Sequence, residues 1–267
     1  MTFRSPSESD VLTSTTNPVI KRIRSLQRRK FRLQERAFVV EGVRAVEDVF
    51  AAGIEPLSVI LRSDVHFTVP DTVTGSVRRV SGQVFDTLTE VAHPQGVLAV
   101  VPMLDEADLP DVSASPLVVL LDRVRDPGNM GTLFRSAAGA GVDHIIIGPE
   151  SVDPYHPKSV RAGMGAHLRI PFSHRENHEI ADYFREFPVV ALADAGGNAI
   201  YDSVNWHSAS AMIIGGEAFG PSSDSHTTAN VIVSIPLANG VESLNAGVAG
   251  SLLMFEAARQ RREAPTT

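Results

Sequence analysis

Apolar and polar positions alternate along this chain in a way that predicts short strands separated by helices. Five continuous apolar runs stand out in the second half, and such runs are typical of parallel strands covered on both faces. These predicted strands are residues 117–121, 144–147, 189–193, 211–214 and 231–235. The predicted helices are residues 131–140, 157–163, 176–187 and 244–262. The second half therefore predicts an α/β domain with a parallel sheet.

The first half predicts a smaller α/β domain by the same reasoning. Asn17-Pro18 is typical of a helix start, and Ile20, Ile23 and Leu26 form its apolar side. The elements expected after it are strands at 37–40, 57–61, 78–80 and 96–101, and helices at 42–52 and 84–89. Ser-, Thr- and Pro-rich residues predict a mobile tail, and a Pro-rich acidic stretch predicts a linker. The expected divisions are a tail at 1–16, a domain at 17–102, a linker at 103–116 and a domain at 117–267.

The last predicted helix has apolar residues at spacings of three and four. We expect this stripe to be its buried face, comprising Leu244, Val248, Leu252, Phe255 and Ala258. Ser243 is the expected N-cap, because its hydroxyl could accept from an amide of the first turn. Small residues also gather in the first turns, namely Ala246, Gly247, Ala249 and Gly250. They predict that a backbone or a flat ligand approaches this helix closely.

Composition narrows the class of protein. The chain has 267 residues, 43% of them hydrophobic, and a net charge of −7. No apolar run approaches the roughly 18 residues of a membrane-spanning helix, and the first residues lack the apolar core of a signal peptide. The chain has no cysteine, which excludes disulfides and thiolate chemistry. A cytoplasmic protein is the resulting expectation.

Positive charge is concentrated in one segment near the N-terminus. Glu35 is the one acidic residue among eight basic ones, which are Lys21, Arg22, Arg24, Arg28, Arg29, Lys30, Arg32 and Arg36. A charge run is commonly just a solvated helix face. The excess of one sign favours a contact with a polyanion such as RNA, and the residues expected to make it are Lys21, Arg22, Arg24, Arg28, Arg29 and Arg32.

Several familiar sites are excluded by their missing motifs. The chain has no GxxxxGK[ST], no dinucleotide fingerprint, no HExxH and no GxSxG. His174 and His178 form a lone i,i+4 pair beside Glu179, which is more typical of a solvated helix face than of a metal site. No metal is expected, and a nicotinamide-dependent dehydrogenase is disfavoured.

Three glycine-rich loops follow predicted strands of the second half. They are DPGNMG at 126–131, GGEAFGP at 215–221 and the segment from Ile235 to Asn245. Glycine after a strand is usually only turn chemistry. However, ligands bind at the carboxyl ends of parallel strands, and all three loops lie at such ends with polar residues beside the glycines. The loops together therefore predict a binding site.

These loops also carry a resemblance to a known family. LDRVRDPGNMGTLFRSAAGAG, IIGGEAFG and IPLANGVESLNAGVAGSLLMFEA resemble the three signature motifs of the SpoU/TrmH-type RNA 2′-O-ribose methyltransferases. That family belongs to the SPOUT class. The resemblance covers residues 116 to 262, and PYHPKSVRAGMGAHLRIPF is similar to the family's segment between the first two motifs. The first half is similar in layout to an L30e-like RNA substrate-binding domain.

The resemblance implies an α/β fold whose C-terminal domain contains a trefoil knot. It implies that S-adenosylmethionine binds there, near Gly215, Gly216, Gly220, Ile235, Leu237 and Leu244. It further implies that the functional polar residues are Asn129, Arg135, Glu217, Ser243 and Asn245. Gly216 departs from the pattern, since members often have Ser, Ala or Asn there, and Gly163 replaces a frequent Ser.

Roles for these polar residues follow from the chemistry of methyl transfer to a hydroxyl, which needs tight positioning and help with proton removal. Arg135 stays charged, so it is expected to clamp a phosphate and stabilise the developing alkoxide. Asn129 would position the ribose or Arg135, and Glu217 would order that pair. Ser243 and Asn245 would fix the loop and the substrate hydroxyl. Without the motif set, an ion pair for Arg135 and a loop cap for Glu217 would be the better interpretations.

The expected substrate is RNA, with ribosomal RNA preferred over transfer RNA because of the extra N-terminal domain. Alternatives are a transfer-RNA ribose methyltransferase, a base methyltransferase of the SPOUT class, and a non-catalytic RNA-binding protein on the same knotted scaffold. The last would be expected to lose Arg135 or Asn245, and both are present. By resemblance, the protein is expected to form a homodimer whose sites are completed across a two-fold axis.

Overall fold

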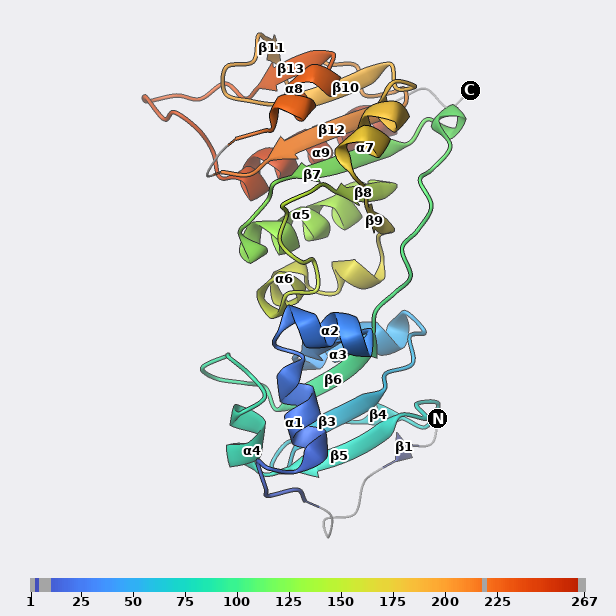
Figure 1. Cartoon of the computed structure of the whole chain (residues 1–267), viewed down its shortest axis with the longest axis vertical. Helices are drawn as coiled ribbons and strands as arrows, with labels where there is room; N and C mark the ends of the chain where they lie inside the picture. The colour runs from blue at the N-terminus through green and yellow to red at the C-terminus, as the bar shows by residue number, and fades with distance from the viewer. Residues whose placement is uncertain (1–2, 5–10, 218–219, 264–267) are drawn as a thin grey trace. The chain divides into compact units, whose positions relative to one another are not determined.

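The computed structural model describes residues 3–4, 11–217 and 220–263. Contacts between Cα atoms divide the chain into two compact units, and Figure 1 labels the elements of both. The first unit comprises Met1–Leu104 and Tyr155–Arg161, and the second comprises Asp105–Pro154 and Ala162–Thr267. The sequence predicts functional domains at residues 17–102 and 117–267, and these domain bounds stay a prediction.

The first unit contains a four-stranded sheet in the order β2-β6-β3-β5. Its strands are β2 (Ala37–Glu41), β3 (Ser58–Arg62), β5 (Ser76–Val80) and β6 (Val97–Pro102). Strand β6 is antiparallel to both β2 and β3, while β3 and β5 are parallel. The helices are α1 (Pro18–Ser25), α2 (Arg29–Glu35), α3 (Val43–Ala51) and α4 (Gly82–Asp86). Short strands β1 (Phe3–Arg4) and β4 (Val69–Pro70) pair separately.

The N-terminal helix begins where the sequence predicts. The side chain of Asn17 accepts from the amide of Val19 at 2.9 Å, and Pro18 occupies the first turn. Ile20, Ile23 and Leu26 are buried against the sheet, as expected from their spacing.

The expected mobile tail is only partly described. Leu12 forms a parallel bridge with Val80 and packs against the same core, so the ordered chain begins before the helix. Residues 1–2 and 5–10 of that tail lie outside the described residues.

The basic segment forms two helices instead of one continuous helix that begins at Asn17-Pro18. Arg28 between them has an extended backbone, with φ −100° and ψ 131°, and this breaks the helix. Helix α2 then ends at Arg36, whose φ of 46° is left-handed. The break changes which basic side chains face solvent.

The second unit is built on seven parallel strands in the order β11-β13-β10-β12-β7-β8-β9. Their bounds are β7 Leu117–Asp122, β8 His144–Ile147, β9 Phe172–His174, β10 Val189–Ala193, β11 Ala199–Ile200, β12 Ser210–Gly215 and β13 Val231–Ser234. All five expected strands are confirmed. Strands β9 and β11 were missed because they have three and two residues, too few for an apolar run to stand out. The α/β class with a parallel sheet is therefore confirmed.

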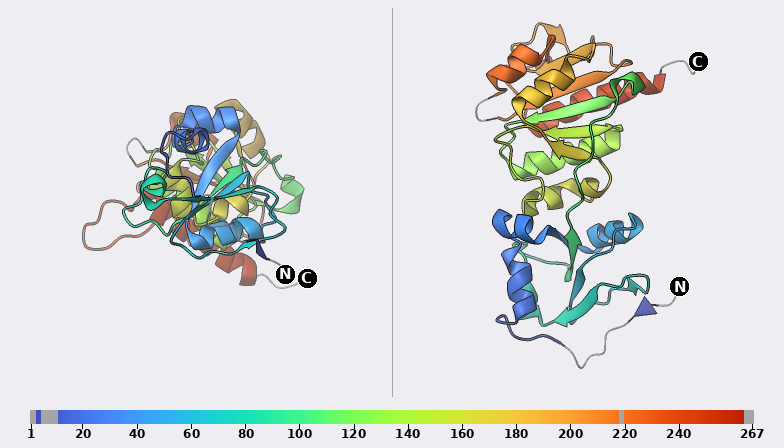
Figure 2. Two further views of the ribbon diagram at one scale, coloured as in Figure 1. Left: turned by 90° about the horizontal axis from the view of Figure 1, so that it is seen from below. Right: turned by 45° about the vertical axis from the view of Figure 1, so that its right-hand side comes forward.

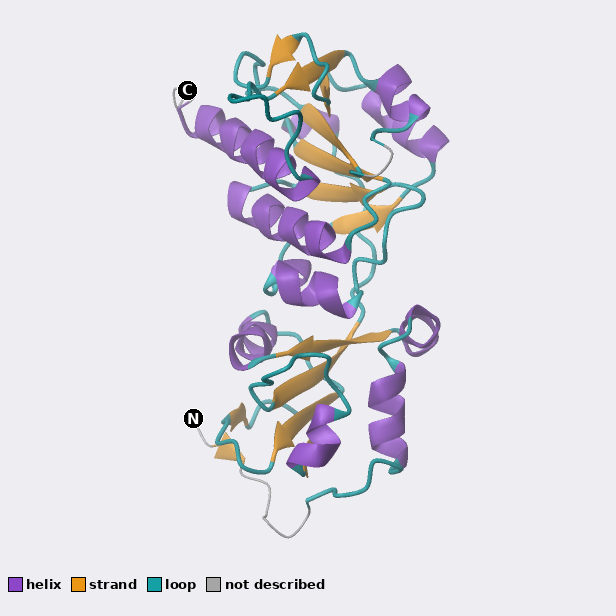
Figure 3. Ribbon diagram, turned by 90° about the vertical axis from the view of Figure 1, so that its left-hand side faces the viewer, coloured by secondary structure: helices purple, strands orange, loops and turns teal. Residues whose placement is uncertain are grey.

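Helices cover both faces of this sheet (Figure 3). They are α5 (Pro127–Ala140), α7 (Asn177–Phe184), α8 (Ser223–Thr228) and α9 (Ala246–Glu263), and the unit also has short 3-10 helices at Val112–Ala114 and Ala166–Leu168. Helix α6 (Pro157–Gly163) is not one of them, because most of its residues belong to the first unit. Ile180 and Phe184 of α7 pack on one face, against alternate strand residues such as Leu120. Helices α5 and α9 pack against each other on the other face (Figure 2). Both faces are buried, which explains the continuous apolar runs.

Helix α9 differs from its expected form at its start and on its buried face. The N-cap is Asn245 instead of Ser243, since the Asn245 Oδ1 accepts from the Val248 amide at 3.2 Å. The expected apolar face is wrong in its centre: Val248, Leu252 and Phe255 are 47%, 40% and 49% exposed. The helix instead buries the side that comprises Ala246, Gly247, Gly250, Leu253, Met254, Ala257 and Ala258.

The small residues of α9 do permit the close approach that they predict. A Cβ at Gly250 would lie 2.4 Å from Leu133 of α5 and 3.3 Å from Ile214 of β12. A side chain at this position would therefore push α9 away from both elements. The small face packs against the protein's own core, and the apolar stripe is left on the surface.

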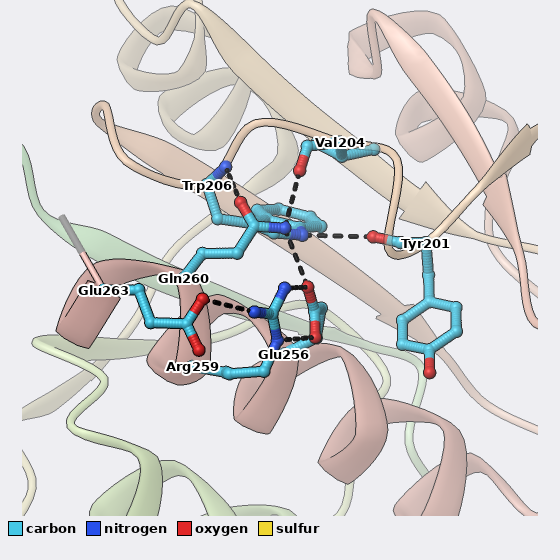
Figure 4. A network of polar contacts seen from close by, with 7 residues as sticks. All are labelled: Tyr201, Val204, Trp206, Glu256, Arg259, Gln260 and Glu263. Carbon is cyan, nitrogen blue, oxygen red and sulfur yellow. Dashed lines mark hydrogen bonds and ion pairs between the residues drawn. The ribbon is translucent and has the colours of Figure 1, made fainter.

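A polar network fixes the C-terminal half of α9 (Figure 4). Gln260 accepts from the Trp206 amide and donates to the Val204 carbonyl, both at 3.0 Å. Arg261 donates to the carbonyls of Trp206 and Ser208, and also to that of Pro116 just before β7. These contacts satisfy buried backbone groups of an irregular loop.

Among the described residues, no helix is long and apolar enough to cross a membrane.

Candidate active site

The three glycine-rich loops follow β7, β12 and β13, and these strands lie close together in the sheet. Strand β12 pairs with β7 on one side and with β10 on the other, and β10 pairs with β13. All the strands run parallel, so their carboxyl ends share one edge. The prediction that the three loops share one strand edge is therefore confirmed.

Asn129 comes from the first loop, inside the first turn of α5. The sequence predicted that it precedes the helix, and this is wrong by one turn. Asp126 is the N-cap, and its carboxylate accepts from the Asn129 amide at 2.9 Å, while Pro127 occupies the first turn. An early helix start holds Asn129 rigidly, with the residue 9% exposed.

Glu217 joins the second and third loops to Asn129. Its Oε1 accepts from Asn129 Nδ2 at 2.8 Å, from Asn245 Nδ2, and from the Ala246 amide at 3.1 Å. Asn245 Nδ2 also donates to Asn129 Oδ1 at 2.9 Å. A carboxylate with three donors makes strong, charge-assisted hydrogen bonds. The two asparagine amides are thus held in fixed orientations at the strand ends.

Two residues that were expected to join this cluster, Arg135 and Ser243, do not bond to it within the chain. Arg135 is exposed on α5, and no hydrogen bond or ion pair joins it to another described residue. Six residues separate it from Asn129, so the two point to different sides of the helix. Arg135 and Asn129 are therefore not brought together within one chain, and the expected pairing of the two stays a proposal that needs a second copy. Ser243 is also outside the hydrogen-bonded group and lines a neighbouring cavity instead.

That cavity has a volume of about 220 Å³ and lies between the second and third loops. Its lining includes all six residues expected near the cofactor, which are Gly215, Gly216, Gly220, Ile235, Leu237 and Leu244. Glu217, Ala246 and Ala249 close it on the side of α9. The lining is mainly apolar with exposed backbone groups, which suits a flat ligand held by main-chain contacts.

Backbone segments approach closely around this cavity. A Cβ at Gly215 would lie 2.6 Å from the Pro221 nitrogen, and one at Gly216 would lie 2.0 Å from the Arg123 carbonyl oxygen. The absence of a side chain at Gly216 is therefore required here by the neighbouring main chain. This explains why Gly216 departs from the resembled pattern.

The loop after β10 also lines the cavity, although the three motifs did not indicate it. Ala193, Asp194 and Ala195 line it, and Asp194 accepts from the Gly196 amide at 2.7 Å. The sequence does contain a feature that indicates this loop, because the loop also follows a parallel strand and carries two glycines. It was overlooked because its polar residue matched none of the three motifs.

His167 is buried against the middle of α5. Its ring stacks on Phe134 of α5, with 4.4 Å between the ring centroids. Burial lowers the pKa of His167 to about 4, so the ring is neutral at ordinary pH. A Cβ at Gly163 would lie 2.6 Å from this ring, which explains the glycine that replaces a frequent serine.

The basic segment separates into residues with different environments. Arg32 is 1% exposed and donates to the carbonyls of Leu26 and Gln27 at 2.9 and 2.8 Å. Its expected role as a phosphate contact is wrong for this conformation, because the side chain fills the junction of α1 and α2. Arg22 pairs with Glu35 at 2.6 Å. The exposed members of the expected set are Lys21, Arg22, Arg24, Arg28 and Arg29.

Metal ligands do not gather at the described positions. Nowhere in residues 3–4, 11–217 and 220–263 do three His, Asp or Glu side chains come together as a metal site would need. His174 instead pairs with Glu106, with 2.7 Å between Nδ1 and Oε1. The hydrogen-bonded cluster at the strand ends is built from two side-chain amides, one carboxylate and one backbone amide.

Comparison with known proteins gives relatives along nearly the whole chain. The 23S rRNA (guanosine(2553)-2′-O)-methyltransferase RlmP of Bacillus subtilis is 30% identical, over 91% of this chain and 97% of the relative. A crystal structure of an AdoMet-bound rRNA methyltransferase from Sinorhizobium meliloti is similar, with a TM-score of 0.82, 29% identity, and coverage of 93% of this chain and 97% of that one. The SpoU methyltransferase AviRb from Streptomyces viridochromogenes, in complex with AdoMet, has a TM-score of 0.78, 26% identity and coverage of 93% and 100%.

Family models match both halves of the chain. Residues 17–99 match the MRM3-like substrate binding domain. Residues 116–255 match the SpoU rRNA methylase family, and this range holds Asn129, Glu217, Asn245 and the cavity beside them. The chain therefore belongs to the SpoU rRNA methylase family.

Proposed function

We propose that this protein transfers a methyl group from S-adenosylmethionine to a ribose 2′-hydroxyl of RNA, with ribosomal RNA as the preferred substrate. The family and the named relatives support an RNA 2′-O-ribose methyltransferase. The observation that carries the proposal is the cluster in which Glu217 holds both Asn129 and Asn245 beside an apolar cavity. If Glu217 only capped a loop, it would have no need to orient two side-chain amides at the wall of the cavity.

The cavity fits the methyl donor. Its lining combines apolar side chains with main-chain groups at Gly215, Ile235 and Leu244, which would hold the adenosyl and methionyl parts. When bound, S-adenosylmethionine supplies an electrophilic methyl group. The lack of side chains at Gly215 and Gly216 keeps the backbone in place, so the donor is positioned without large conformational change.

The Asn129–Glu217–Asn245 cluster would position the ribose. Glu217 fixes the amide orientations, which leaves the substrate hydroxyl a small set of hydrogen-bonding directions. Preorganised dipoles of this kind stabilise charge as it develops, without reorganisation during the reaction. Ser243 lines the donor cavity, so its role in this proposal is to shape that cavity and the third loop.

Arg135 would act across a homodimer interface. Arg135 and Gly139 are four residues apart on α5 and so share a face. A Cβ at Gly139 would lie 3.5 Å from the ring of Phe255, so this face borders the exposed stripe of Val248, Leu252 and Phe255. An exposed apolar stripe of this kind marks an interaction surface. Burying it against a second copy would bring Arg135 toward the partner's substrate, where it could clamp a phosphate.

The trefoil knot is also part of this proposal, together with an RNA-binding role for the N-terminal residues 17–102. The match to a substrate binding domain supports that role. The exposed basic residues Lys21, Arg22, Arg24, Arg28 and Arg29 would contact phosphates there. A cytoplasmic location stays a prediction.

Nucleoside mass spectrometry tests the reaction. Ribosomal and transfer RNA from cells with and without the gene would be digested and compared. We expect one 2′-O-methylated nucleoside to disappear from ribosomal RNA. Loss of a base methylation, or loss from transfer RNA, would contradict the substrate proposed here, and no change would favour the non-catalytic alternative.

Mixing two inactive variants tests the shared site. Arg135→Ala and Glu217→Ala should each abolish turnover as homodimers. If Arg135 serves the partner's site, heterodimers carry one intact site, so an equal mixture should recover about one quarter of wild-type activity. Phe255→Asp should give a monomer in light scattering. Failure to recover activity, with heterodimers present, would contradict the shared site.

A further inference from the structure

A second cavity lies on the other side of the Glu217 cluster from the donor cavity. It has a volume of about 270 Å³. It shares Gly216, Glu217 and Ala246 with the donor cavity, so these residues form the wall between the two. The rest of its lining is the first loop and the residues before it: Arg123, Val124, Arg125, Asp126 and Asn129. A ribose attacking the donor's methyl group must approach this wall from the side that the donor does not occupy.

Two arginines line this second cavity, directly after β7. Asp126, the acid beside them, accepts from the Asn129 amide as the N-cap of α5, and the partial positive charge of the helix N-terminus offsets its charge. Glu217 is likewise held by three donors. The cavity therefore combines arginine donors with carboxylates already engaged by the protein.

The backbone around these arginines is strained. Arg123 has a φ of 56°, and Glu150, which pairs with Arg125, has a φ of 60°. Non-glycine residues rarely adopt such angles, because the Cβ then lies too close to the neighbouring backbone. The Arg123 carbonyl contacts Gly216, so the turn is held in place by the wall of the site. Such strain commonly accompanies functional loops.

The ion pair between Arg125 and Glu150 is exchangeable. The two side chains are 45% and 59% exposed, and exposed pairs contribute little to stability. A phosphodiester offers arginine a bidentate partner with equal charge and better geometry. Arg125 can therefore exchange Glu150 for a phosphate at small cost.

We propose that the second cavity binds a phosphodiester adjacent to the target ribose, with Arg125 as its main ligand and Glu150 as the internal competitor that holds Arg125 ready. This inference rests on the proposed function and names the part of the RNA that this surface recognises. It differs from the role of Arg135, which would come from the partner subunit. Arg123 contributes mainly by its strained turn, which fixes the position of Arg125.

Steady-state kinetics against salt concentration test the proposal. The probe is deproteinised ribosomal RNA from cells that lack the gene, with radiolabelled S-adenosylmethionine. Arg125→Ala should raise the KM for this RNA on the order of ten-fold, because one charge-assisted contact is lost. It should also reduce the slope of log(kcat/KM) against log salt by about one, since one phosphate contact disappears. The Kd of S-adenosylmethionine should not change.

Two further variants make the test specific. Glu150→Gln should lower the KM, because the competitor of the phosphate is removed. Arg185→Ala is the matched control, since Arg185 also forms an exposed pair, with Asp182, but lines no part of this cavity. Its salt slope should equal that of the wild type.

The outcomes separate this inference from the function itself. An unchanged KM and salt slope in Arg125→Ala, with an active wild type, would overturn the inference and leave the methyltransfer intact. Weaker binding of S-adenosylmethionine in Arg125→Ala would also overturn it, because the residue would then be structural. A wild type that transfers no methyl group would instead refute the proposed function.

Discussion

The cluster at the strand ends and the basic segment near the N-terminus use polar residues in opposite ways. At the strand ends, Asn129, Glu217 and Asn245 come from loops far apart in sequence and bond to one another. In the basic segment, similar residues close in sequence have different environments: Arg32 is buried, Arg22 is paired, and Arg29 is exposed. A spaced motif thus fixes the geometry of its members, whereas a run of charge does not.

Among the substitutions that test this comparison, the largest effect on activity is expected at Glu217. Glu217→Ala removes the acceptor that aligns two amides, so kcat should fall about 10²- to 10³-fold or more, as when a preorganised dipole is lost. The Kd of S-adenosylmethionine, measured by calorimetry, should change much less than kcat, because Glu217 is one of many residues that line the donor cavity. Glu242→Gln is the control, because Glu242 is an exposed acid of the third loop outside the cluster. Near-normal turnover in Glu217→Ala would show that the cluster is only a loop cap.

A smaller effect is expected where Arg32 and Arg29 are compared. Arg32→Met leaves the Leu26 and Gln27 carbonyls without their donor, which should lower the free energy of unfolding by about 2–3 kcal/mol. Arg29→Ala should leave stability within about 0.5 kcal/mol, because its side chain is exposed. Urea unfolding and RNA binding would be measured for both.

The two arginines should also differ in RNA binding. Arg29→Ala should weaken binding and reduce its salt dependence, whereas folded Arg32→Met should bind RNA as the wild type does. Equal effects of both variants on stability and binding would remove the distinction between the buried and exposed arginines.

The smallest effect is expected at the Arg22–Glu35 pair. Both side chains are partly exposed, at 57% and 30%, so Glu35→Gln should cost less than about 1 kcal/mol of stability. The variant frees Arg22 for phosphate, and RNA affinity at low salt should rise about two-fold. Lower affinity would indicate that the pair instead orients Arg22 for binding.

Much of the fold could be predicted from the sequence, because burial on both faces leaves a clear pattern. Strands β7, β8, β10, β12 and β13 matched their apolar runs closely. Two-residue strand β11 could not be predicted, since its pairing with β13 depends on tertiary contact. The stripe of α9 was assigned to the core because a pattern of apolar residues does not reveal what covers it. Here the glycines and alanines lie against α5 and β12, and the larger side chains face solvent.

The motifs predicted which positions lie close together but not the directions of their side chains, and the roles of these residues stay predictions. The motifs indicated Asn129, Glu217 and Asn245, and the six cavity residues, all of which lie together. They did not indicate that Arg135 points to another side of α5, because the resemblance gives positions along the chain and not directions around a helix. Asp194 was missed because it belongs to none of the motifs.

The attachment of the last helix has a consequence for local unfolding of the chain. Asn245 and Ala246, at the start of α9, complete the cluster, and Arg261 near its end binds the carbonyl of Pro116, where the sheet of this unit begins. A chain whose α9 has separated from the sheet has neither contact, so detaching this one helix dismantles the cluster and frees the start of β7 together. The site can therefore exist only while the helix is docked.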